Sequence, residues 1–425
     1  MSEFQTRRLD SFIAEGSVLL GRGDIISKED IDAYPGPYPI YSSSAQGYGK
    51  FGEYGKFMFD EELVTWSVDG GGYFFYRDKH RYSVTNVCGY MRVKSSKLHP
   101  KFVFYSLANQ HRYLTFDYTT KAHPSVIQKL YWLPTIGYER QRKIATILTG
   151  IDTVIEKTEA LIAKYQQIKA GLMHDLFTRG VLPNGQLRPL REQAPDLYQE
   201  TAIGWIPREW SVSTLEGLLA SLPNNIRSGP FGSALLKHEL VEDGIPFLGI
   251  DNIHTEHFEA EFRRFVSERK FVELAKYKVR PRDVVITIMG TVGRCCVIPD
   301  NLELALSSKH LWTMTFDPEK VIPELVCWQL NHASWAQAWF RRAMQGGIMD
   351  AIQSSTLKAL LLPVPSIDEQ SLIYEYYLKI TTRIRQDSGQ LTKLQKQKLG
   401  LMHDLLTGKV PVTIENKTTT TEAVA

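Results

Sequence analysis

The sequence has few cysteines, and their spacing fits none of the sites that cysteine commonly builds. Its four cysteines, Cys88, Cys295, Cys296 and Cys327, form no CxxC pair and no Cys/His ligand spacing. Because adjacent cysteines rarely bridge each other, the pattern predicts a reduced, cytoplasmic compartment and no structural zinc.

Long hydrophobic runs are also missing. The N-terminal residues lack the apolar core of a signal peptide, and no later apolar run approaches the ~18 residues of a membrane span. We therefore expect a soluble protein that is not exported. The 425 residues, 43% of them hydrophobic and 23% charged, suit two or three domains. The net charge of +3 is too small to identify an anionic partner.

Motifs for catalysis are absent or incomplete. The run Gly47-Tyr48-Gly49-Lys50-Phe51-Gly52 fits G-x-G-x-x-G, but a second glycine and aromatic turn follows it where a dinucleotide site needs a helix. No G-x-x-x-x-G-K-[ST] motor motif occurs, and neither does the Asn-Pro-Pro-aromatic run of a base-methylating site. We predict a non-catalytic chain with no metal site and no cofactor of its own.

What the sequence does contain is an internal repeat. The run Gly171-Leu172-Met173-His174-Asp175-Leu176 returns as Gly400-Leu401-Met402-His403-Asp404-Leu405. The match extends backwards without a gap to Leu133 and Leu362, with roughly 18 identities in about 49 positions. Each copy follows a longer region of mixed pattern. The sequence therefore predicts a tandem duplication of one globular part and one long helix.

Both repeated segments carry apolar residues at the a and d spacing of a heptad, which predicts two long helices. We expect helices over about 139–177 and 368–406, each nearly 60 Å long. The seam positions, predicted to mediate helix pairing, are Ile144, Ile151, Ile155, Leu172, Ile373, Ile380, Ile384 and Leu401. An antiparallel intramolecular coil that separates the globular parts is favoured. The alternative is that each helix packs on its own domain.

This pattern predicts an α+β fold with two β-rich globular domains separated by the two helices. The expected segments are a first globular domain (1–137), a central helix (138–180), a linker (181–209), a second globular domain (210–366), a distal helix (367–410) and a disordered tail (411–425). Expected strands include Leu63-Val64-Thr65-Trp66 and Val284-Val285-Ile286-Thr287. Both are followed by glycines, which indicates that the globular regions are diverged copies too.

Basic and aromatic residues near glycine-rich turns are the candidates for contact with an anionic polymer, because such groups grip phosphates and reach base edges. Most individual members are expected to be ordinary surface residues. The candidates are Tyr76, Arg77, Lys79, His80 and Arg81 in the first region, and Arg227, Lys237, Arg294, Lys309 and His310 in the second.

The duplicated Gly-Leu-Met-His-Asp-Leu ending, the Leu-Pro then Glu/Asp-x-Gln entry to each helix, and the run Gly229-Pro230-Phe231-Gly232-Ser233 resemble type I restriction-modification specificity subunits. The resemblance covers nearly the whole chain, and its repeated helices are its most specific part. It implies that each globular region is a target recognition domain reading one half of a split, asymmetric sequence in double-stranded DNA.

The resemblance further implies that the helices set the spacing between the half-sites and dock two methyltransferase subunits. Those partners would bring S-adenosylmethionine, and restriction subunits would bring ATP- and Mg²⁺-dependent translocation and cleavage. A rival interpretation is a non-catalytic scaffold with two protein-binding modules joined by a coiled coil. The scaffold predicts no salt-dependent affinity for duplex DNA.

Overall fold

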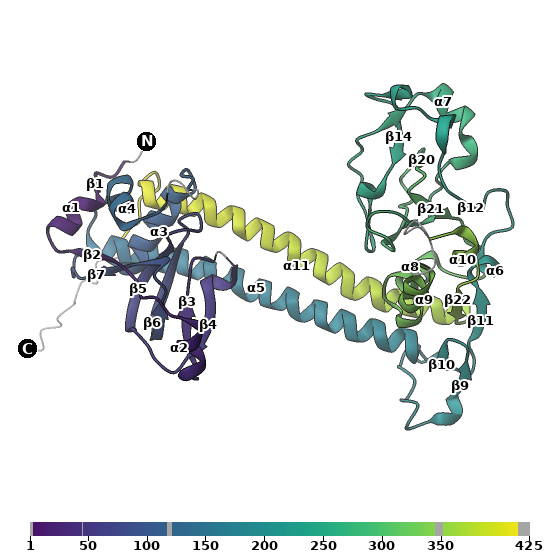
Figure 1. Ribbon diagram of the computed structural model, residues 1–425, viewed down its shortest axis with the longest axis horizontal. Coiled ribbons are helices and arrows are strands. Elements are labelled where there is room, and N and C mark those ends of the chain that lie inside the picture. Colours follow the sequence, from purple (N-terminus) through teal and green to yellow (C-terminus); the bar gives the residue numbers. More distant parts are fainter. Residues whose placement is uncertain (1–2, 45, 117–120, 345–351, 415–425) are drawn as a thin grey trace, which may run out of the picture. The chain divides into compact units, whose positions relative to one another are not determined.

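The computed structural model describes residues 3–44, 46–116, 121–344 and 352–414. The chain divides into two compact units (Figure 1). Unit 1 comprises Met1–Ile162 with Asp387–Ala425, and unit 2 comprises Ala163–Gln386. Each unit therefore contains one globular part and portions of both long helices. Within the described ranges, no helix combines the length and the apolarity needed to cross a membrane.

Unit 1 is built on a six-stranded sheet in the order β2-β7-β5-β6-β3-β4. Its pairs are antiparallel except for β3 with β6. The sheet strands are β2 (Val18–Arg22), β3 (Tyr38–Tyr41), β4 (Lys50–Tyr54), β5 (Phe59–Ser67), β6 (Phe74–Val84) and β7 (Cys88–Val93), and the short helices of the unit are α1 (Leu9–Ala14), α2 (Lys28–Ala33), α3 (Pro100–His111) and α4 (Pro124–Leu130).

The core of unit 1 lies between this sheet and helices α1, α3 and α4. Trp66 in β5 is fully buried, and its indole Nε1 donates to the Ala122 carbonyl at 2.7 Å. The neighbouring strand approaches so closely that a Cβ on Gly89 would lie 2.2 Å from the Trp66 ring. Glycine is therefore required beside the largest side chain of this core.

Unit 2 has shorter strands in several small sheets. Two four-stranded sheets have the orders β12-β21-β18-β19 and β13-β17-β14-β20. Their strands are β12 (Ile226–Arg227), β13 (Leu240–Val241), β14 (Ile245–Leu248), β17 (Phe265–Val266), β18 (Val284–Thr287), β19 (Cys295–Val297), β20 (Leu306–Ser307) and β21 (Leu311–Met314). Further elements are the pair β15 (Ile253–His254) and β16 (His257–Phe258), and helices α6 (Leu215–Leu218), α7 (Glu268–Glu273), α8 (Pro323–His332), α9 (Ser334–Met344) and α10 (Ser354–Lys358).

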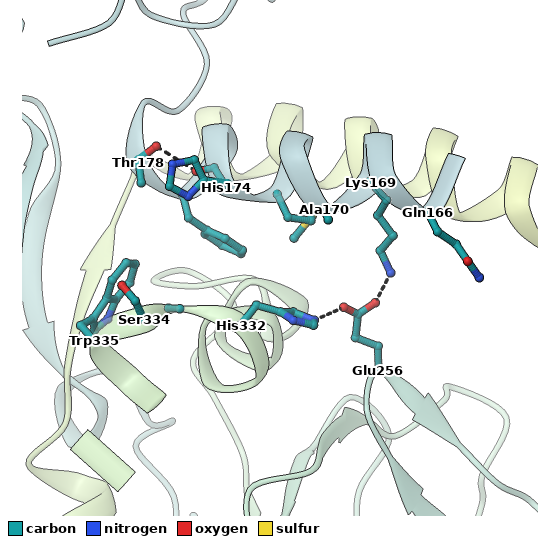
Figure 2. Close-up of a pocket in the computed structure, with 12 residues that line it drawn as sticks. Gln166, Lys169, Ala170, His174, Thr178, Glu256, His332, Ser334 and Trp335 are labelled. Atoms are coloured by element: carbon teal, nitrogen blue, oxygen red, sulfur yellow. Dashed lines mark hydrogen bonds and ion pairs between the residues drawn. The ribbon is translucent and has the colours of Figure 1, made fainter. Parts of the chain in front are cut away.

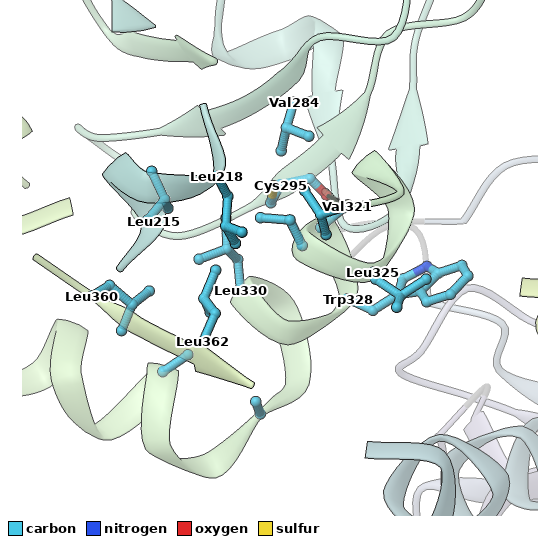
Figure 3. Close-up of a cluster of buried hydrophobic side chains, with 14 of the residues drawn as sticks. Leu215, Leu218, Val284, Cys295, Val321, Leu325, Trp328, Leu330, Leu360 and Leu362 are labelled. Atoms are coloured by element: carbon cyan, nitrogen blue, oxygen red, sulfur yellow. Dashed lines mark hydrogen bonds between the residues drawn. The ribbon is translucent and has the colours of Figure 1, made fainter. Parts of the chain in front are cut away.

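The main core of unit 2 forms around helix α8. Leu325, Trp328 and Leu330 from α8 pack with Val284 of β18 and Leu362 near the chain's second long helix (Figure 3). All five side chains are at most 1% exposed. This core joins β18, an inner strand of its sheet, to residues 361–364, which lead into the long helix that begins at Ile367.

The globular parts share a topology, as the sequence echo between their central strands predicted. The strand order β2-β7-β5-β6 in unit 1 corresponds to β12-β21-β18-β19 in unit 2. In both, a hairpin links the central strand to the next one, β5 to β6 and β18 to β19. The duplication therefore extends beyond the helices to the framework of the globular parts.

A two-stranded ribbon closes each globular part onto its helix. In unit 1, β1 (Thr6–Arg8) pairs with β8 (Trp132–Pro134), and in unit 2, β11 (Ser211–Thr214) pairs with β22 (Leu361–Val364). The next backbone bond is also repeated, because Leu9 N donates to the Tyr131 carbonyl at 2.9 Å and Leu215 N to the Leu360 carbonyl at 2.8 Å.

One buried glutamine locks the start of each long helix. Gln141 donates to the Lys97 and Ile136 carbonyls at 2.9 and 2.8 Å and accepts from His99 N at 2.9 Å. Its counterpart Gln370 donates to the Lys320 and Pro365 carbonyls at 3.0 and 2.9 Å and accepts from Ile322 N at 2.8 Å. Both glutamines are at most 1% exposed. The Glu/Asp-x-Gln entry read from the sequence is therefore a repeated structural anchor.

The long helices are α5 (Tyr138–Thr178) and α11 (Ile367–Thr407), and they contact each other antiparallel within each unit (Figure 1). In unit 1, Ile144 and Leu148 of α5 share a core cluster with Met402 and Leu405 of α11. In unit 2, residues from the end of α5 share a cluster with Ile373 and Tyr377 of α11. The predicted antiparallel pairing is confirmed, although each helix also packs on the globular part of that unit, as the alternative expected.

Two expectations need correction or fall outside the described residues. The segment 181–209 is not a linker without secondary structure, because β9 (Tyr198–Thr201) and β10 (Gly204–Pro207) form a hairpin there. The tail prediction concerns residues 411–425, of which 415–425 lie outside the described residues.

The segment after α5 is instead anchored by a buried ion pair. Arg188 is 2% exposed, and its guanidinium bonds to both carboxylate oxygens of Glu369 at the start of α11. Trp210 Nε1 donates to the same carboxylate at 3.0 Å, and Val181 N does so at 2.8 Å. The polar composition of residues 181–209 suggested an irregular segment. The partner that orders it, Glu369, lies far away along the chain and leaves no local signal.

Candidate DNA interface

The exposed candidates of unit 1 lie on strand β6, of which residues 78, 79 and 81 are exposed. Lys79 and Arg81 are exposed, whereas Tyr76 and His80 are half-buried. Arg81 donates to the Tyr38 hydroxyl at 3.0 Å and lies 4.9 Å from the centre of the Phe57 ring. His80 stacks on Tyr82 with 4.5 Å between ring centres, and its Nε2 lies 3.1 Å from the Tyr41 hydroxyl. The result is a cationic and aromatic surface on this strand.

Tyr76 is tied to the neighbouring strand. Its hydroxyl donates to the Glu62 carboxylate, and Lys101 Nζ lies 4.8 Å from the centre of its ring. Burial, followed by the Glu62 hydrogen bond, raises the pKa of Tyr76 above its usual value. The hydroxyl therefore stays protonated and can act as a hydrogen-bond donor.

Arg77 and Arg227 lie in the interior and have protein partners. Arg77 is 4% exposed, donates to the Tyr48 carbonyl at 2.6 Å, and stacks 3.7 Å from the centre of the Tyr41 ring. Arg227, also 4% exposed, pairs with the buried Asp283. We therefore remove both arginines from the candidate contacts and assign them structural roles. Sequence could not distinguish them, because a buried arginine and a surface arginine look alike in a glycine-rich region.

The buried pair of unit 2 carries opposed electrostatic effects. Burial lowers the pKa of Arg227 to about 10, despite the attraction of Asp283. Burial also raises the pKa of Asp283, because desolvation outweighs the Arg227 charge and the hydrogen bond from Thr315. Both directions express the cost of removing a charge from water, which the mutual contact only partly offsets.

Three of the unit 2 candidates lie together around one cavity. Lys237, Lys309 and His310 line a space of ≈ 150 Å³ together with Pro230 and Gly232 of the glycine-rich run. Arg294 is elsewhere, half-buried in the turn between β18 and β19, where its carbonyl accepts from Thr287 N at 2.9 Å. The structure therefore joins the glycine-rich run with candidates that are about 80 residues away in the sequence.

Sequence reasoning missed a half-buried carboxylate on the β15–β16 hairpin. Figure 2 shows Glu256 reaching toward Lys169 of α5 and His332 at the end of α8, and its carboxylate contacts both. The Tyr377 hydroxyl of α11 donates to the same carboxylate. Glu256 has a left-handed backbone with φ 59°. A single glutamate in a hairpin turn carries no sequence signal of such a role.

The partners of Glu256 control its protonation. Burial alone would raise its pKa, but hydrogen bonds from His332, Lys169 and Tyr377 outweigh burial and lower the pKa to about 2. The charged carboxylate closes one end of a ≈ 530 Å³ cavity, whose walls include Met173, Phe177 and Trp335. Glu256 thereby fastens a hairpin of the globular part to both long helices.

The predicted seam residues are partly or fully covered. Ile144, Ile155 and Ile373 are buried, and Ile151, Leu172, Ile380, Ile384 and Leu401 are half-buried. Packing therefore accounts for these apolar positions, and their part in subunit docking stays a prediction.

Exposed residues near the ends of the helices match between the copies, which packing does not explain. The pairs Lys164 and Lys393, Gln166 and Gln395, Gly171 and Gly400, and His174 and His403 are each identical and exposed in both copies. Before Lys164, the exposed positions of α5 match α11 only at Thr153 and Thr382. We call the set 164, 171 and 174, with its counterpart 393, 400 and 403, the repeated face, because such spacings share one side of a helix.

Comparison with known proteins agrees with this architecture. The family model described as "Type I restriction modification DNA specificity domain" matches residues 1–167. A type I restriction enzyme specificity subunit of Methanocaldococcus jannaschii, MjaVIII, is 24% identical over 357 residues, which are 82% of this chain and 79% of that protein. A putative MjaX specificity subunit from the same organism is 25% identical over 76% of this chain and 71% of its own length.

A solved structure extends the match to the fold of nearly the whole chain. The crystal structure of a type I restriction-modification system S subunit from M. genitalium has a TM-score of 0.62 at 17% identity, covering 97% of both chains. Residues 1–167 match this family, and the chain is similar to type I restriction-modification specificity subunits over most of its length. Members of this family are non-catalytic, and the role of the chain is DNA recognition.

Proposed function

We propose that this specificity subunit reads an asymmetric, two-part target in double-stranded DNA, with one half-site read by each globular part. The observation that carries the proposal is the shared framework with different exposed surfaces. Unit 1 presents exposed cations among aromatic rings on β6, whereas unit 2 presents lysines around a cavity. Different arrangements of donors and charges prefer different base edges and groove shapes, so the two half-sites should differ.

The test is to map methylated adenines across the genome with the gene present and with it deleted. The expected result is a motif of two short, different halves with a fixed gap, and this motif disappears on deletion. A methylation pattern that deletion leaves unchanged would contradict the proposal.

The repeated face supports two copies of one partner, which we take to be the methyltransferase subunit. The same exposed residues occur on both helices, so a partner that binds one face can bind the other. S-adenosylmethionine then belongs to these partners, and ATP and Mg²⁺ to the restriction subunits that join the complex. Assembly on chromosomal DNA implies a cytoplasmic location.

Glycines on the helices offer a clean test of docking. A Cβ at Gly171 or Gly400 would meet no atom within 4 Å, so arginine fits the fold there yet obstructs the repeated face. Gly171→Arg or Gly400→Arg should each reduce the bound methyltransferase subunits from two to one, and the double variant should bind none, as measured by native mass spectrometry.

Gly150→Arg and Gly389→Arg are matched controls, because these glycines are equally open and lie outside the repeated face. Both should retain two methyltransferase subunits. If Gly171→Arg and Gly400→Arg also retained two, the partner would dock elsewhere.

The helices are also proposed to set the gap between the half-sites. A heptad inserted into both α5 and α11 keeps the seam in register and adds ~10 Å to each helix. At ~3.4 Å per base pair, the gap should widen by about three base pairs while both half-sites stay the same. Methylome sequencing of the variant measures this directly, and an unchanged gap would refute the spacing role.

A further inference from the structure

A cavity at the ends of two parallel strands in unit 2 has the features of an anion site. Strands β14 and β20 run parallel, and residues 308–310 follow directly after β20. The cavity of ≈ 150 Å³ is lined by Ser308, Lys309 and His310, and also by Lys237.

The glycine-rich run builds the other wall. Gly229 N donates to the Ser308 carbonyl at 3.1 Å, and a Cβ on Gly229 would lie 2.0 Å from the Ser307 carbonyl oxygen. Gly232 has φ 60°, a left-handed conformation that favours glycine. Gly229 is therefore needed for the close approach to residues 307–308, and Gly232 for the local turn of the run.

Ser308 lines the cavity, and its hydroxyl oxygen is enclosed and unpaired. Ser308 is 5% exposed, and its Oγ has no hydrogen-bond partner among the described residues. A buried hydroxyl without a partner costs about 1–3 kcal/mol, so native proteins rarely keep one without a reason. A ligand that accepts a hydrogen bond would satisfy it.

The charges around the cavity favour an anion. Lys237 and Lys309 are exposed, and the half-buried His310 lies beside Lys309. Burial, then the charges of Lys309 and Arg264, lower the pKa of His310, which indicates a positive environment. Two carboxylates on neighbouring segments are already neutralised, Glu239 by Lys270 and Asp251 by Arg264.

We propose that the cavity bounded by Ser308, Lys309, His310 and Lys237 holds a phosphodiester group of the bound DNA, with the Ser308 hydroxyl donating to a phosphate oxygen. The inference rests on the proposed function. Lysine acts on phosphate as a mobile point charge, whereas specific base recognition more often uses the flat, bidentate arginine or amide groups, which this cavity lacks. The contact positions the second globular part on the duplex without reading a base.

The test compares variants of the full chain in its assembled complex, binding duplexes with and without the target sequence. Lys309→Gln and Lys237→Gln should each weaken both duplexes by a similar factor and make the slope of log affinity against log salt shallower by about 0.9. Ser308→Ala should weaken both duplexes about twofold to tenfold and leave the slope unchanged. Lys276→Gln, an exposed lysine of unit 2 outside the cavity, is the control and should change neither.

Ser308→Ala has a second readout that separates binding from folding. Because the hydroxyl is unpaired in the free protein, its removal should leave the melting temperature unchanged or raised while DNA affinity falls. A lowered melting temperature with unchanged affinity would show that Ser308 only supports the fold and would overturn the proposal.

The remaining outcomes distinguish the sources of failure. If the wild-type complex does not bind DNA, the proposed function fails. If it binds and the three variants match it, the cavity proposal alone fails. Weakening restricted to the target duplex would assign the cavity to base reading instead. An inorganic phosphate titration is the last arm: stabilisation by phosphate that the variants abolish, with DNA affinity unaffected, would assign the site to a free anion and overturn the DNA assignment.

Discussion

The two units of this chain use the same buried anchors and differ in what they attach to them. Gln141 and Gln370 make the same three hydrogen bonds to equivalent backbone groups. Lys169 and Lys398 are also equivalent, yet Lys169 pairs with Glu256 of a hairpin, whereas Lys398 pairs with Asp152 of α5 at 2.6 Å. The backbone frame therefore kept its anchors after duplication, while side-chain partners changed freely around it.

The largest expected difference concerns the buried arginines. Arg227→Met leaves Asp283 buried without its cation and should cost about 3–5 kcal/mol of the free energy of unfolding. Arg77→Met leaves no such carboxylate partner among its described contacts and loses hydrogen bonds and ring stacking, so about 1–3 kcal/mol is expected. Denaturant unfolding measures both. Equal losses would show that the Asp283 charge is not what makes unit 2 more sensitive.

The next difference concerns the two equivalent lysines and depends on pH. Hydrogen bonds lower the pKa of Glu256 from 4.5 to about 2 in the folded chain. The Glu256 carboxylate therefore stabilises the fold fully above about pH 4.5, and this stabilisation disappears as the pH falls toward 2. Glu256→Gln should therefore cost about 2–3 kcal/mol at pH 7 and very little near pH 2.

The control variants define that comparison. Asp152→Asn, which breaks the corresponding contact with Lys398 in unit 1, should cost about 1 kcal/mol, because both partners are partly exposed. Glu242→Gln, on an exposed residue of unit 2, should cost almost nothing. A Glu256→Gln loss that stays constant between pH 7 and pH 3 would contradict the assigned role.

The two glutamine anchors should respond alike. Gln141→Ala and Gln370→Ala each leave backbone groups without partners and should each cost about 2 kcal/mol, measured by thermal or denaturant unfolding. The exposed Gln166→Ala should cost less than about 0.5 kcal/mol. A loss at only one of the two anchors would show that the copies no longer share the same frame.

The smallest effects are expected where one copy has a glycine and the other does not. Gly150 corresponds to Lys379, and Gly389 corresponds to Ala160. Neither glycine has an atom within 4 Å of a built Cβ, so Gly150→Ala and Gly389→Ala should each raise the free energy of unfolding by about 0.5–1 kcal/mol. Destabilisation would reveal that these glycines are needed for close helix contact.

The sequence predicted the parts of the fold that repeat. The a/d spacing and the duplicated ending placed both long helices to within a residue or two, and the strand echo identified the central strands β5 and β18. It did not predict the hairpin at residues 198–207, because its buried anchor, Arg188 with Glu369, joins residues 181 positions apart. Periodicity reports on local structure and carries no signal of such pairs.

The sequence predicted which types of residue form the candidate interface, but it did not predict where those residues lie in the fold. Arg77 and Arg227 are of the residue type that binds phosphates, yet both are buried and contact groups of the protein instead. The sequence indicates Lys237, Lys309 and His310 only as separate residues, and the fold brings them to one cavity with the unpaired Ser308. Strand order decides which loops meet, and the amino-acid sequence does not predict the strand order.

The most direct test replaces the second globular part with a copy of the first. The repeated bonds between Leu9 and Tyr131 and between Leu215 and Leu360 define matching junctions, so residues 9–131 can substitute for residues 215–360. Methylome sequencing of cells that carry this variant should show a symmetric motif made of the first half-site twice, with the wild-type gap. A motif that keeps the original second half-site would contradict the assignment of one half-site to each globular part.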